Sequence, residues 1–327
     1  FESGHNIRAS HKPLSIGTYA IFLVSLVIVT ATVSSMVTKK RLARQTSSSE
    51  IALLDPSNPK SEFYQAYQQS FGFLDDIPNK SWKLMKERVR NQENHLFPDD
   101  PMKETLLAFR WYQDNWEPDF SCQHERRIGG MGDGPKWVCN PHRIAQISRT
   151  RKCLIYSVGS EGDFTFETGL YQALGGKAAS SKTKHQSSGC EIHVFDPKDY
   201  SSSIPEEIES MIHFHPWGIV DEASVSTNFK TLQETVDILG HSGRIVDIFK
   251  IDCEHCEWKT YKDWLSVDLD LRQILVEVHG TPSNVNDFFE TLQNENYVTF
   301  HKEPNTKYSI GNCLEYAFLK LDPSFFD

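Results

Sequence analysis

The chain has 327 residues with a formal net charge of −10, and 39% of its residues are hydrophobic and 24% charged. This composition is typical of globular proteins and excludes disordered, collagen-like and small disulfide-rich chains. The first 44 residues hold six basic side chains and one acidic side chain, so the rest of the chain is strongly acidic. An acidic body argues against a nucleic-acid partner, because phosphate binding needs clustered Lys and Arg.

The N-terminal region is predicted to be a tail over residues 1–13 and a membrane-spanning helix over residues 14–38. Its centre, residues 19–29, is almost wholly apolar, and an uncharged stretch of this length can cross a bilayer as one helix. A cleaved signal peptide is the alternative, although its apolar core is usually shorter. A basic flank and a polar stalk rich in Ser and Pro follow over residues 39–61.

The charges around this segment do not settle which side of the membrane the body would occupy. The basic residues after the span favour a cytosolic body under the positive-inside rule. Asn79 begins a glycosylation sequon, which would be used only in a secretory lumen. Cys122 and Cys139 flank a glycine-rich turn and are expected to pair in a disulfide if the body is lumenal.

The body begins with helix-like spacing of its apolar residues over residues 62–94 and 101–116, which predicts a helical preamble over residues 62–120. From Lys152 onward, short apolar runs alternate with helical stretches, the pattern of a mostly parallel sheet covered by helices on both faces. The predicted strands are residues 153–158, 191–195, 211–214, 245–251, 274–278, 297–300 and 314–319, and the predicted helices are residues 165–174, 231–239, 257–265 and 285–294. The connection over residues 302–311 is too short and polar for a crossover helix, so the last two strands should be antiparallel neighbours.

Two features at strand ends predict a ligand site. Gly159 and Gly162 directly follow the first strand, where glycine lets the backbone approach a ligand closely. Asp196 ends the second strand, where an acid can bind the two hydroxyl groups of a ribose. The glycines alone are equally compatible with an ordinary tight turn, and the acid makes the pattern more specific.

Four segments occur in a recognisable order: residues 158–164 (VGSEGDF), 194–197 (VFDP), 249–258 (FKIDCEHCEW) and 275–279 (LVEVH). In this order they resemble the motifs of S-adenosylmethionine-dependent methyltransferases of the FkbM type, and more closely those of the methyltransferase-like protein 24 family. The resemblance extends over about residues 120–322. It implies a Rossmann-like seven-strand methyltransferase sheet over residues 121–327, mostly parallel with an antiparallel last strand.

The resemblance also implies the cofactor, S-adenosyl-L-methionine, and the residues that bind it. Gly159, Ser160, Glu161 and Gly162 would wrap the methionine part, and Asp196 would hold the ribose. The sulfonium of this cofactor is cationic, which suits an acidic body and a glutamate in the turn.

Asp252, Glu254 and His279 are the predicted catalytic residues. Asp252 and Glu254 end the fourth strand, although Asp252 could instead cap the following helix. The family pattern there is Asp-x-Glu-Gly, and His255 replaces the glycine, which puts the turn geometry in doubt. His279 ends the fifth strand on the same face as Glu277, and is predicted to be the general base for an alcohol acceptor, with a structural hydrogen-bonded histidine as the alternative.

Metal binding is considered and not adopted. His213 and His215 share a strand face and could join Asp252 and Glu254 in a cluster, but such mixed sets arise often by accident. The Cys253–Cys256 segment resembles a redox or zinc half-site, yet no second cysteine pair with zinc spacing is present in the sequence.

Together these patterns predict a membrane-anchored O-methyltransferase that contacts the membrane through residues 14–38, acts on a small-molecule or glycan acceptor and binds no nucleic acid. The resemblance and the stalk favour a lumenal catalytic domain on a Golgi or other secretory-pathway membrane. One alternative is a scaffold with a degenerate site, in which His255 prevents catalysis. The other is a dinucleotide-binding oxidoreductase, disfavoured because Gly159 and Gly162 lack the full glycine set of that fold.

Overall fold

A computed structural model describes residues 52–94, 108–175, 190–222, 228–307 and 309–327. The chain separates into two units, residues 1–64 and residues 65–327. The first unit contributes only residues 52–64 to the description, with helical residues at 52–54. The second unit contains all the features described below, apart from the first residue of one short helix, α2 (Tyr64–Gln69).

The predicted membrane-spanning helix requires a correction to the fold class. Within the described ranges, none of the helices combines the length and the apolar character that a bilayer crossing requires. The longest of them, α3 (Asn79–Asn91), has 13 residues and is therefore about 20 Å long, against a hydrocarbon core of about 30 Å. Residues 14–38 themselves lie outside the described residues. On this finding the single-pass membrane protein, its secretory-membrane localisation and its membrane contact are not supported.

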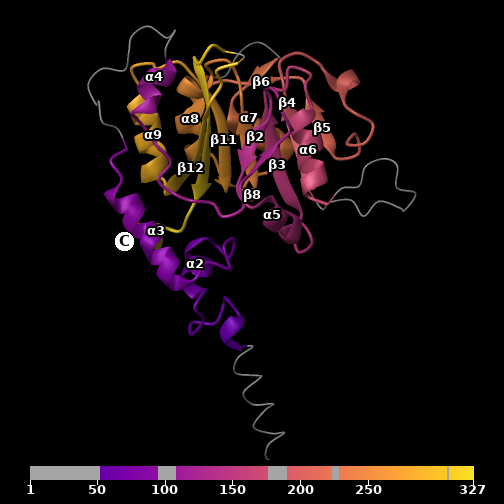
Figure 1. The fold of residues 1–327 in the computed structure, drawn as a ribbon. Coiled ribbons are helices and arrows are strands. Elements are labelled where there is room, and N and C mark those ends of the chain that lie inside the picture. Colours follow the sequence, from indigo (N-terminus) through magenta and orange to yellow (C-terminus); the bar gives the residue numbers. More distant parts are fainter. Residues whose placement is uncertain (1–51, 95–107, 176–189, 223–227, 308) are drawn as a thin grey trace, which may run out of the picture. The chain divides into compact units, whose positions relative to one another are not determined.

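The centre of the fold is a seven-stranded mixed sheet in the order β12-β13-β11-β9-β3-β4-β5 (Figure 1). The strands are β3 (Cys153–Val158), β4 (Cys190–Phe195), β5 (Ile212–His215), β9 (Ile248–Ile251), β11 (Gln273–His279), β12 (Tyr297–Pro304) and β13 (Cys313–Lys320). Only β13 runs against its two neighbours, and the other adjacent pairs are parallel. The order reverses at β3, so a ligand is expected where β3 and β9 end.

The predicted strands agree with this sheet, with one difference. The run predicted over residues 245–251 is divided into β8 (Arg244–Val246) and β9 by Asp247. The buried Asp247 carboxylate accepts a hydrogen bond from the Leu154 backbone at 3.1 Å and pairs with Arg151. β8 leaves the main sheet and pairs with β10 (Leu269–Leu271). The predicted antiparallel pairing of the last two strands is confirmed by the register of β12 and β13.

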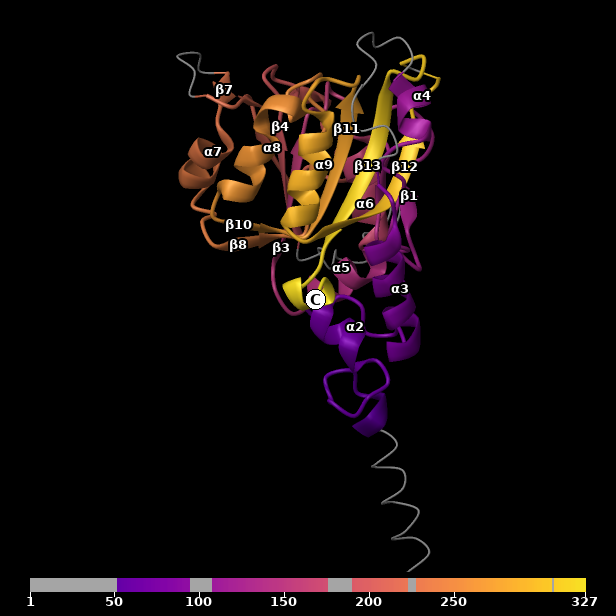
Figure 2. The ribbon, with the colours of Figure 1, turned by 90° about the vertical axis from the view of Figure 1, so that its left-hand side faces the viewer.

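Helices cover both faces of the sheet, as the alternating pattern predicts (Figure 2). Alternate residues of β3 point to opposite sides, with Ile155 in one buried cluster and Tyr156 in the other. The first cluster includes residues of α3, α5 (Pro141–Ile147) and α6 (Thr165–Ala173). The second includes residues of α4 (Ala108–Gln113), α7 (Leu232–Leu239), α8 (Glu257–Ser266) and α9 (Val285–Asn294).

The helical stretch predicted over residues 62–94 consists of two helices, α2 and α3. Phe71 and Gly72 both adopt left-handed backbone conformations, with φ of 56° and 78°, and end α2. Pro78 directly precedes α3, whose first residue is Asn79. Residues 95–107, where part of the next predicted helix falls, lie outside the described residues, as do residues 176–189.

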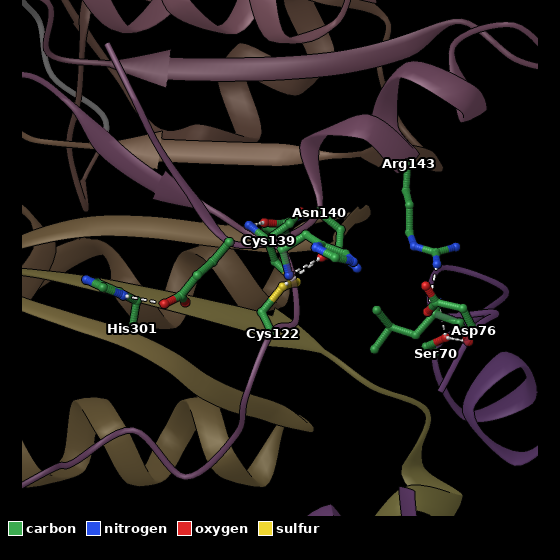
Figure 3. The surroundings of a disulfide bond; sticks show 11 residues. Ser70, Asp76, Cys122, Cys139, Asn140, Arg143 and His301 are labelled. Carbon is green, nitrogen blue, oxygen red and sulfur yellow. Dashed lines mark hydrogen bonds and ion pairs between the residues drawn. A yellow bond between two sulfur atoms is a disulfide. The ribbon is translucent and has the colours of Figure 1, made fainter. Parts of the chain in front are cut away.

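The disulfide expected between Cys122 and Cys139 is present (Figure 3). It joins the segment that precedes β1 (Arg126–Ile128) to the residue that follows β2 (Lys136–Val138). Figure 3 also shows Arg143 of α5, whose guanidinium pairs with Asp76 at 2.8 Å. The disulfide joins the two flanks of the β1–β2 hairpin, and the Cys139 backbone exchanges hydrogen bonds with the Gln273 side chain of β11 at 2.9 and 3.0 Å. β2 carries a lysine to the site described below.

A substitution of Gly159 tests the contact between the ends of β3 and β9. Gly159 has φ +74°, and a Cβ there would lie 1.6 Å from the backbone oxygen of Asp252. Gly159→Ala should therefore lower the free energy of unfolding by about 3 kcal/mol or more, measured by chemical denaturation. Gly134→Ala is the control, because its nearest neighbour would be at 3.4 Å. Equal stability of the two variants would contradict this account.

Candidate functional site

A cavity of about 460 Å³ lies at the carboxyl ends of β3, β9 and β11. Six of the eight predicted site residues line it: Gly159, Ser160, Glu161, Asp252, Glu254 and His279. The other two, Gly162 and Asp196, do not. Residues that were not predicted as site residues also contribute to its walls, among them Asp133, Lys250, Glu277, Asn305 and Cys313. The structure therefore brings the three predicted catalytic residues and three of the five predicted cofactor residues to one cavity.

Asp196 lies beneath the loop that joins β3 to α6. Its side chain is buried, and its Oδ2 accepts hydrogen bonds from the backbone N–H groups of Ser160 at 3.2 Å and Glu161 at 2.9 Å. Its Oδ1 accepts a third, from the Lys198 backbone at 3.0 Å. Both carboxylate oxygens are thus used inside the protein, where they fix the conformation of the loop.

The two glycines of this loop, Gly159 and Gly162, each make a close contact within the protein. A Cβ on Gly162 would lie 2.8 Å from the ring of Tyr200, and the residue has φ +83°. The backbone oxygen of Gly159 accepts a hydrogen bond from Lys250 Nζ at 2.5 Å. The role of the glycines in holding the cofactor stays a prediction. The sequence did not indicate Lys250, whose position follows from the register of β9 beside β3.

Lys136 of β2 is the centre of a charged cluster with Asp252, Glu277 and Glu315, called here the charged wall, of which Asp252 and Glu277 line the cavity. Its side chain is 1% exposed, and Nζ lies 2.6 Å from Glu315, 3.0 Å from Asp252 and 3.7 Å from Glu277. Burial opposes its charge, but the surrounding carboxylates raise the pKa of Lys136 above its usual value. Burial likewise opposes ionisation of Asp252, yet the Lys136 ammonium lowers the pKa of that carboxyl.

One ammonium cannot neutralise three carboxylates. The pKa values of the other two acids, Glu277 and Glu315, are raised. Burial, followed by the charge of Asp252, raises the pKa of Glu277 to about 7. Burial raises the pKa of Glu315 to about 8, and the charge of Glu277 adds to the effect. Glu315 was not predicted as a site residue, because its strand β13 is brought next to β11 only by the antiparallel pairing.

His279 is held by a buried carboxylate. Its backbone N–H and its Nδ1 both lie 2.9 Å from Glu257 Oε1. Burial opposes the charged ring, but hydrogen bonds to Cys313 and to Glu257 raise the pKa of His279 to about 11. The ring is therefore protonated near neutral pH, and an imidazolium cannot accept a proton from an acceptor. His279 lines the cavity, and its contact with Glu257 matches the alternative of a hydrogen-bonded structural histidine, while its catalytic role stays a prediction.

The segment with His255 in place of the family's glycine keeps a turn that glycine would favour. Glu254 and His255 have φ of 53° and 77°, and a disulfide joins Cys253 to Cys256. The N-cap of α8 is Cys256, and Asp252 pairs with Lys136 instead of capping that helix. The side chain of Glu254 is 72% exposed at the rim, with Oε2 3.7 Å from His279 Nε2.

The four residues considered for a metal cluster are not grouped. Among the residues that the structure describes, His215 of β5 instead lies with Nε2 2.8 Å from Nδ1 of His193, while Asp252 and Glu254 lie at the cavity. The groupings that do occur within the same residues are Glu191 with His193 and His241, Glu277 with His279 and Cys313, and Asp252 with Glu277 and Glu315.

Comparisons with known proteins agree with this geometry. A family model described as a methyltransferase domain matches residues 64–320. The human protein "Probable methyltransferase-like protein 24" is 26% identical over 181 residues, which are 49% of this chain and 45% of that protein. Its rat counterpart is 26% identical over 184 residues, with the same coverage. The matched part thus spans less than half the length of these relatives.

A solved structure gives a weaker similarity. The 1,6-didemethyltoxoflavin-N1-methyltransferase of Burkholderia thailandensis, solved with S-adenosylhomocysteine, is 11% identical, with a TM-score of 0.31. The alignment covers 56% of this chain and 78% of that one. The family-model match and the two relatives support the predicted relation to methyltransferase-like protein 24, and the narrower FkbM assignment stays a prediction.

Removal of the central charge tests the charged wall. Lys136→Met would leave three buried carboxylates without their cation, and should lower the free energy of unfolding by about 3 kcal/mol or more at pH 8. The loss should be smaller at pH 5, because Glu277 and Glu315, with pKa values raised to about 7 and 8, are then uncharged.

Chemical denaturation at the two pH values measures both effects. Lys83→Met is the matched control, because Lys83 is an exposed lysine paired with Glu87 on α3, and should change the stability by about 0.5 kcal/mol or less. A loss at Lys136 no larger than that at Lys83 would show that the buried ion cluster is not needed for stability.

Proposed function

We propose that this chain, which belongs to the methyltransferase domain family, transfers a methyl group to an oxygen acceptor such as a sugar hydroxyl. Its methyl donor is S-adenosylmethionine, as the sequence predicted. The choice of oxygen rests on Glu277, a buried carboxyl that lines the cavity and accepts a hydrogen bond from Asn305. Burial, followed by the charge of Asp252, raises its pKa to about 7. An alcohol loses a proton as it attacks, and a base whose pKa lies near the working pH is suited to accept it.

The residues of the cavity fit the donor. When bound, S-adenosylmethionine supplies a methyl carbon made electrophilic by its sulfonium charge. Gly159, Ser160 and Glu161 would hold its methionine part, and Asp252 and Glu254 provide the negative charge that favours a cation. We assign Asp196 a positioning role, because its carboxylate fixes the loop through two backbone N–H groups. A contact between Asp196 and the ribose remains a prediction.

The proton of the acceptor would pass to Glu277. Its carboxylate accepts a hydrogen bond from Asn305 Nδ2 at 3.0 Å, which orients it. His279 would not act as the base, because Glu257 helps to keep it protonated, and its positive charge would stabilise the acceptor oxygen as that oxygen loses its proton. Glu254, exposed at the rim, would bind further hydroxyl groups of the acceptor.

A second cavity supports an acceptor rich in hydroxyl groups. It has a volume of about 310 Å³ and shares Asp133 and Asn305 with the first cavity. Arg127 and Glu303 also line it, and Arg127 Nε lies 3.1 Å from Glu303 Oε2. Charged and amide groups of this kind hydrogen-bond hydroxyl groups well. A glycan or another polar small molecule is therefore the proposed acceptor, and the absence of a nucleic-acid partner stays a prediction.

Donor binding is the first test of this proposal. Isothermal titration of S-adenosylmethionine and S-adenosylhomocysteine into the full chain should give micromolar dissociation constants, with no binding of NADH. Asp196→Ala should weaken binding by about tenfold or more, because the buried N–H groups of Ser160 and Glu161 lose their acceptor. Asp199→Ala is the control, since that exposed carboxylate accepts from Ser201 on the surface.

The outcomes separate the competing functions. An unchanged affinity of the folded Asp196→Ala variant would reject the positioning role. Binding of NADH alone would favour the oxidoreductase. Donor binding without turnover, across a screen of glycans and small alcohols that follows S-adenosylhomocysteine release, would favour the scaffold.

The proposed base makes the rate depend on pH. Glu277 must be ionised to accept a proton, so kcat/KM should rise with pH, with a midpoint near the raised pKa of about 7, and then level. Glu277→Gln should lower kcat by about 100-fold or more and remove this rise. The profile is measured with an acceptor from the screen. Asp133→Asn, on the same cavity wall, is the control and should keep the rise; a Glu277→Gln variant with the same profile would exclude Glu277 as the base.

A further inference from the structure

The segment between β9 and α8 is closed by a disulfide between Cys253 and Cys256. It brackets Glu254 and His255, which follow Asp252 at the carboxyl end of β9. We propose that this disulfide is a positioning element of the cavity and a site of thiol–disulfide exchange, and that its reduction by a dithiol weakens donor binding. The effect on donor binding rests on the proposed function; the effect on the segment does not.

The disulfide compensates for a conformation that the residues themselves disfavour. Glu254 and His255 are consecutive, neither is glycine, and both have left-handed φ values of 53° and 77°. Residues with a Cβ adopt this region only when their surroundings impose it. The bond between Cys253 and Cys256 closes a ring around these two residues and restricts their backbone. The disulfide therefore holds a left-handed conformation that a glycine at position 255 would adopt without strain.

The segment is joined to the site at both ends. On one side, the Asp252 backbone N–H donates to Val158 at 3.1 Å, and the Asp252 carboxylate receives Lys136 at 3.0 Å. On the other side, Glu257 is fully buried and holds His279. Any relaxation of the residues between them changes where Glu254 lies, and can be transmitted to the charged wall and to His279.

The position of the disulfide allows a reductant to reach it first. Cys253 and Cys256 are half-buried, and the residues between them are exposed. The four cysteines of the other two disulfides in the described residues, Cys122–Cys139 and Cys153–Cys190, are buried. Since exchange requires access to a sulfur atom, mild reduction should act on Cys253–Cys256 before the others.

The chemical step is balanced by the reductant. One thiolate of the dithiol attacks a sulfur of the disulfide and forms a mixed disulfide, and its second thiol displaces the protein sulfur. The S–S bond of the protein breaks, and Cys253 and Cys256 gain two electrons and two protons as thiols. The dithiol leaves as a disulfide. Glu254 and His255 are then free to leave the left-handed region.

The first experiment compares the oxidised chain with the chain treated with dithiothreitol. Mass mapping identifies the conditions under which only Cys253 and Cys256 are reduced. In those conditions, titration of S-adenosylhomocysteine should show a dissociation constant about tenfold higher or more. An unchanged dissociation constant, with reduction of this pair confirmed, would overturn the proposed effect on binding.

Two variants distinguish the backbone effect from a general loss of a cross-link. The Cys253→Ser/Cys256→Ser variant should bind as weakly as the reduced chain and should not respond to mild dithiothreitol. Addition of His255→Gly to this variant should restore the affinity to within about threefold of the oxidised chain, because glycine adopts positive φ without a Cβ. No recovery in a folded protein would reject the role assigned to the disulfide.

A second readout does not depend on the donor. Hydrogen exchange at the backbone amides of residues 252–257 should become faster after reduction, and slower again in the variant with His255→Gly. Unchanged exchange in the reduced chain would overturn the proposal whether or not the donor binds. Faster exchange in a chain that never binds the donor would instead support the positioning role and reject the proposed function.

Discussion

The buried ammonium of Lys136 is the contact on which the carboxyl edge of the sheet depends. It lies among carboxylates from three separate strand regions, at the end of β9, in β11 and in β13. Without a cation, three acids at this spacing would repel one another in a medium of low dielectric constant. The lysine comes from β2, a three-residue strand of a hairpin outside the main sheet. The small hairpin is therefore part of the site, and the disulfide at its end contributes to keeping the charge in place.

The chemistry proposed for this site would depend on the same cluster of carboxyl groups. In a cluster with more acids than cations, some carboxyl groups have a raised pKa and are partly ionised at neutral pH. Glu277, with its pKa raised to about 7, is such a group. Asp252, whose pKa the Lys136 ammonium holds low, stays ionised near neutral pH and has no such capacity. The division of roles among neighbouring carboxyl groups follows from their burial as well as from the shared ammonium, in the way that paired acids are separated in many enzymes. Glu315 lies nearest to Lys136, at 2.6 Å, but burial raises its pKa to about 8.

Much of this fold could be predicted from the sequence, because each strand is a short apolar run that lies between polar turns. The strand ends then located six of eight expected site residues around one cavity. Lys136, Glu257 and Glu315 could not be recognised in this way. Each reaches the site through a pairing distant in sequence, and a buried charge has no periodic signal. The protonation of His279 could not be predicted either, because it depends on Glu257. The sequence places Glu257 on the helix after β9 but does not show that its side chain points toward His279.

The Cys153–Cys190 disulfide has a consequence for the integrity of the chain. It joins the first residues of the parallel neighbours β3 and β4, across a sequence separation of 37 that includes α6 and residues 176–189. A peptide bond cleaved within residues 176–189 would leave two fragments that are still covalently attached beside the centre of the sheet. The loop between the strands would be opened, but the disulfide would still hold the two fragments together, so the pairing of β3 with β4 would remain intramolecular. Cleavage there would therefore leave the strands that precede Gly159 and Asp196 joined side by side.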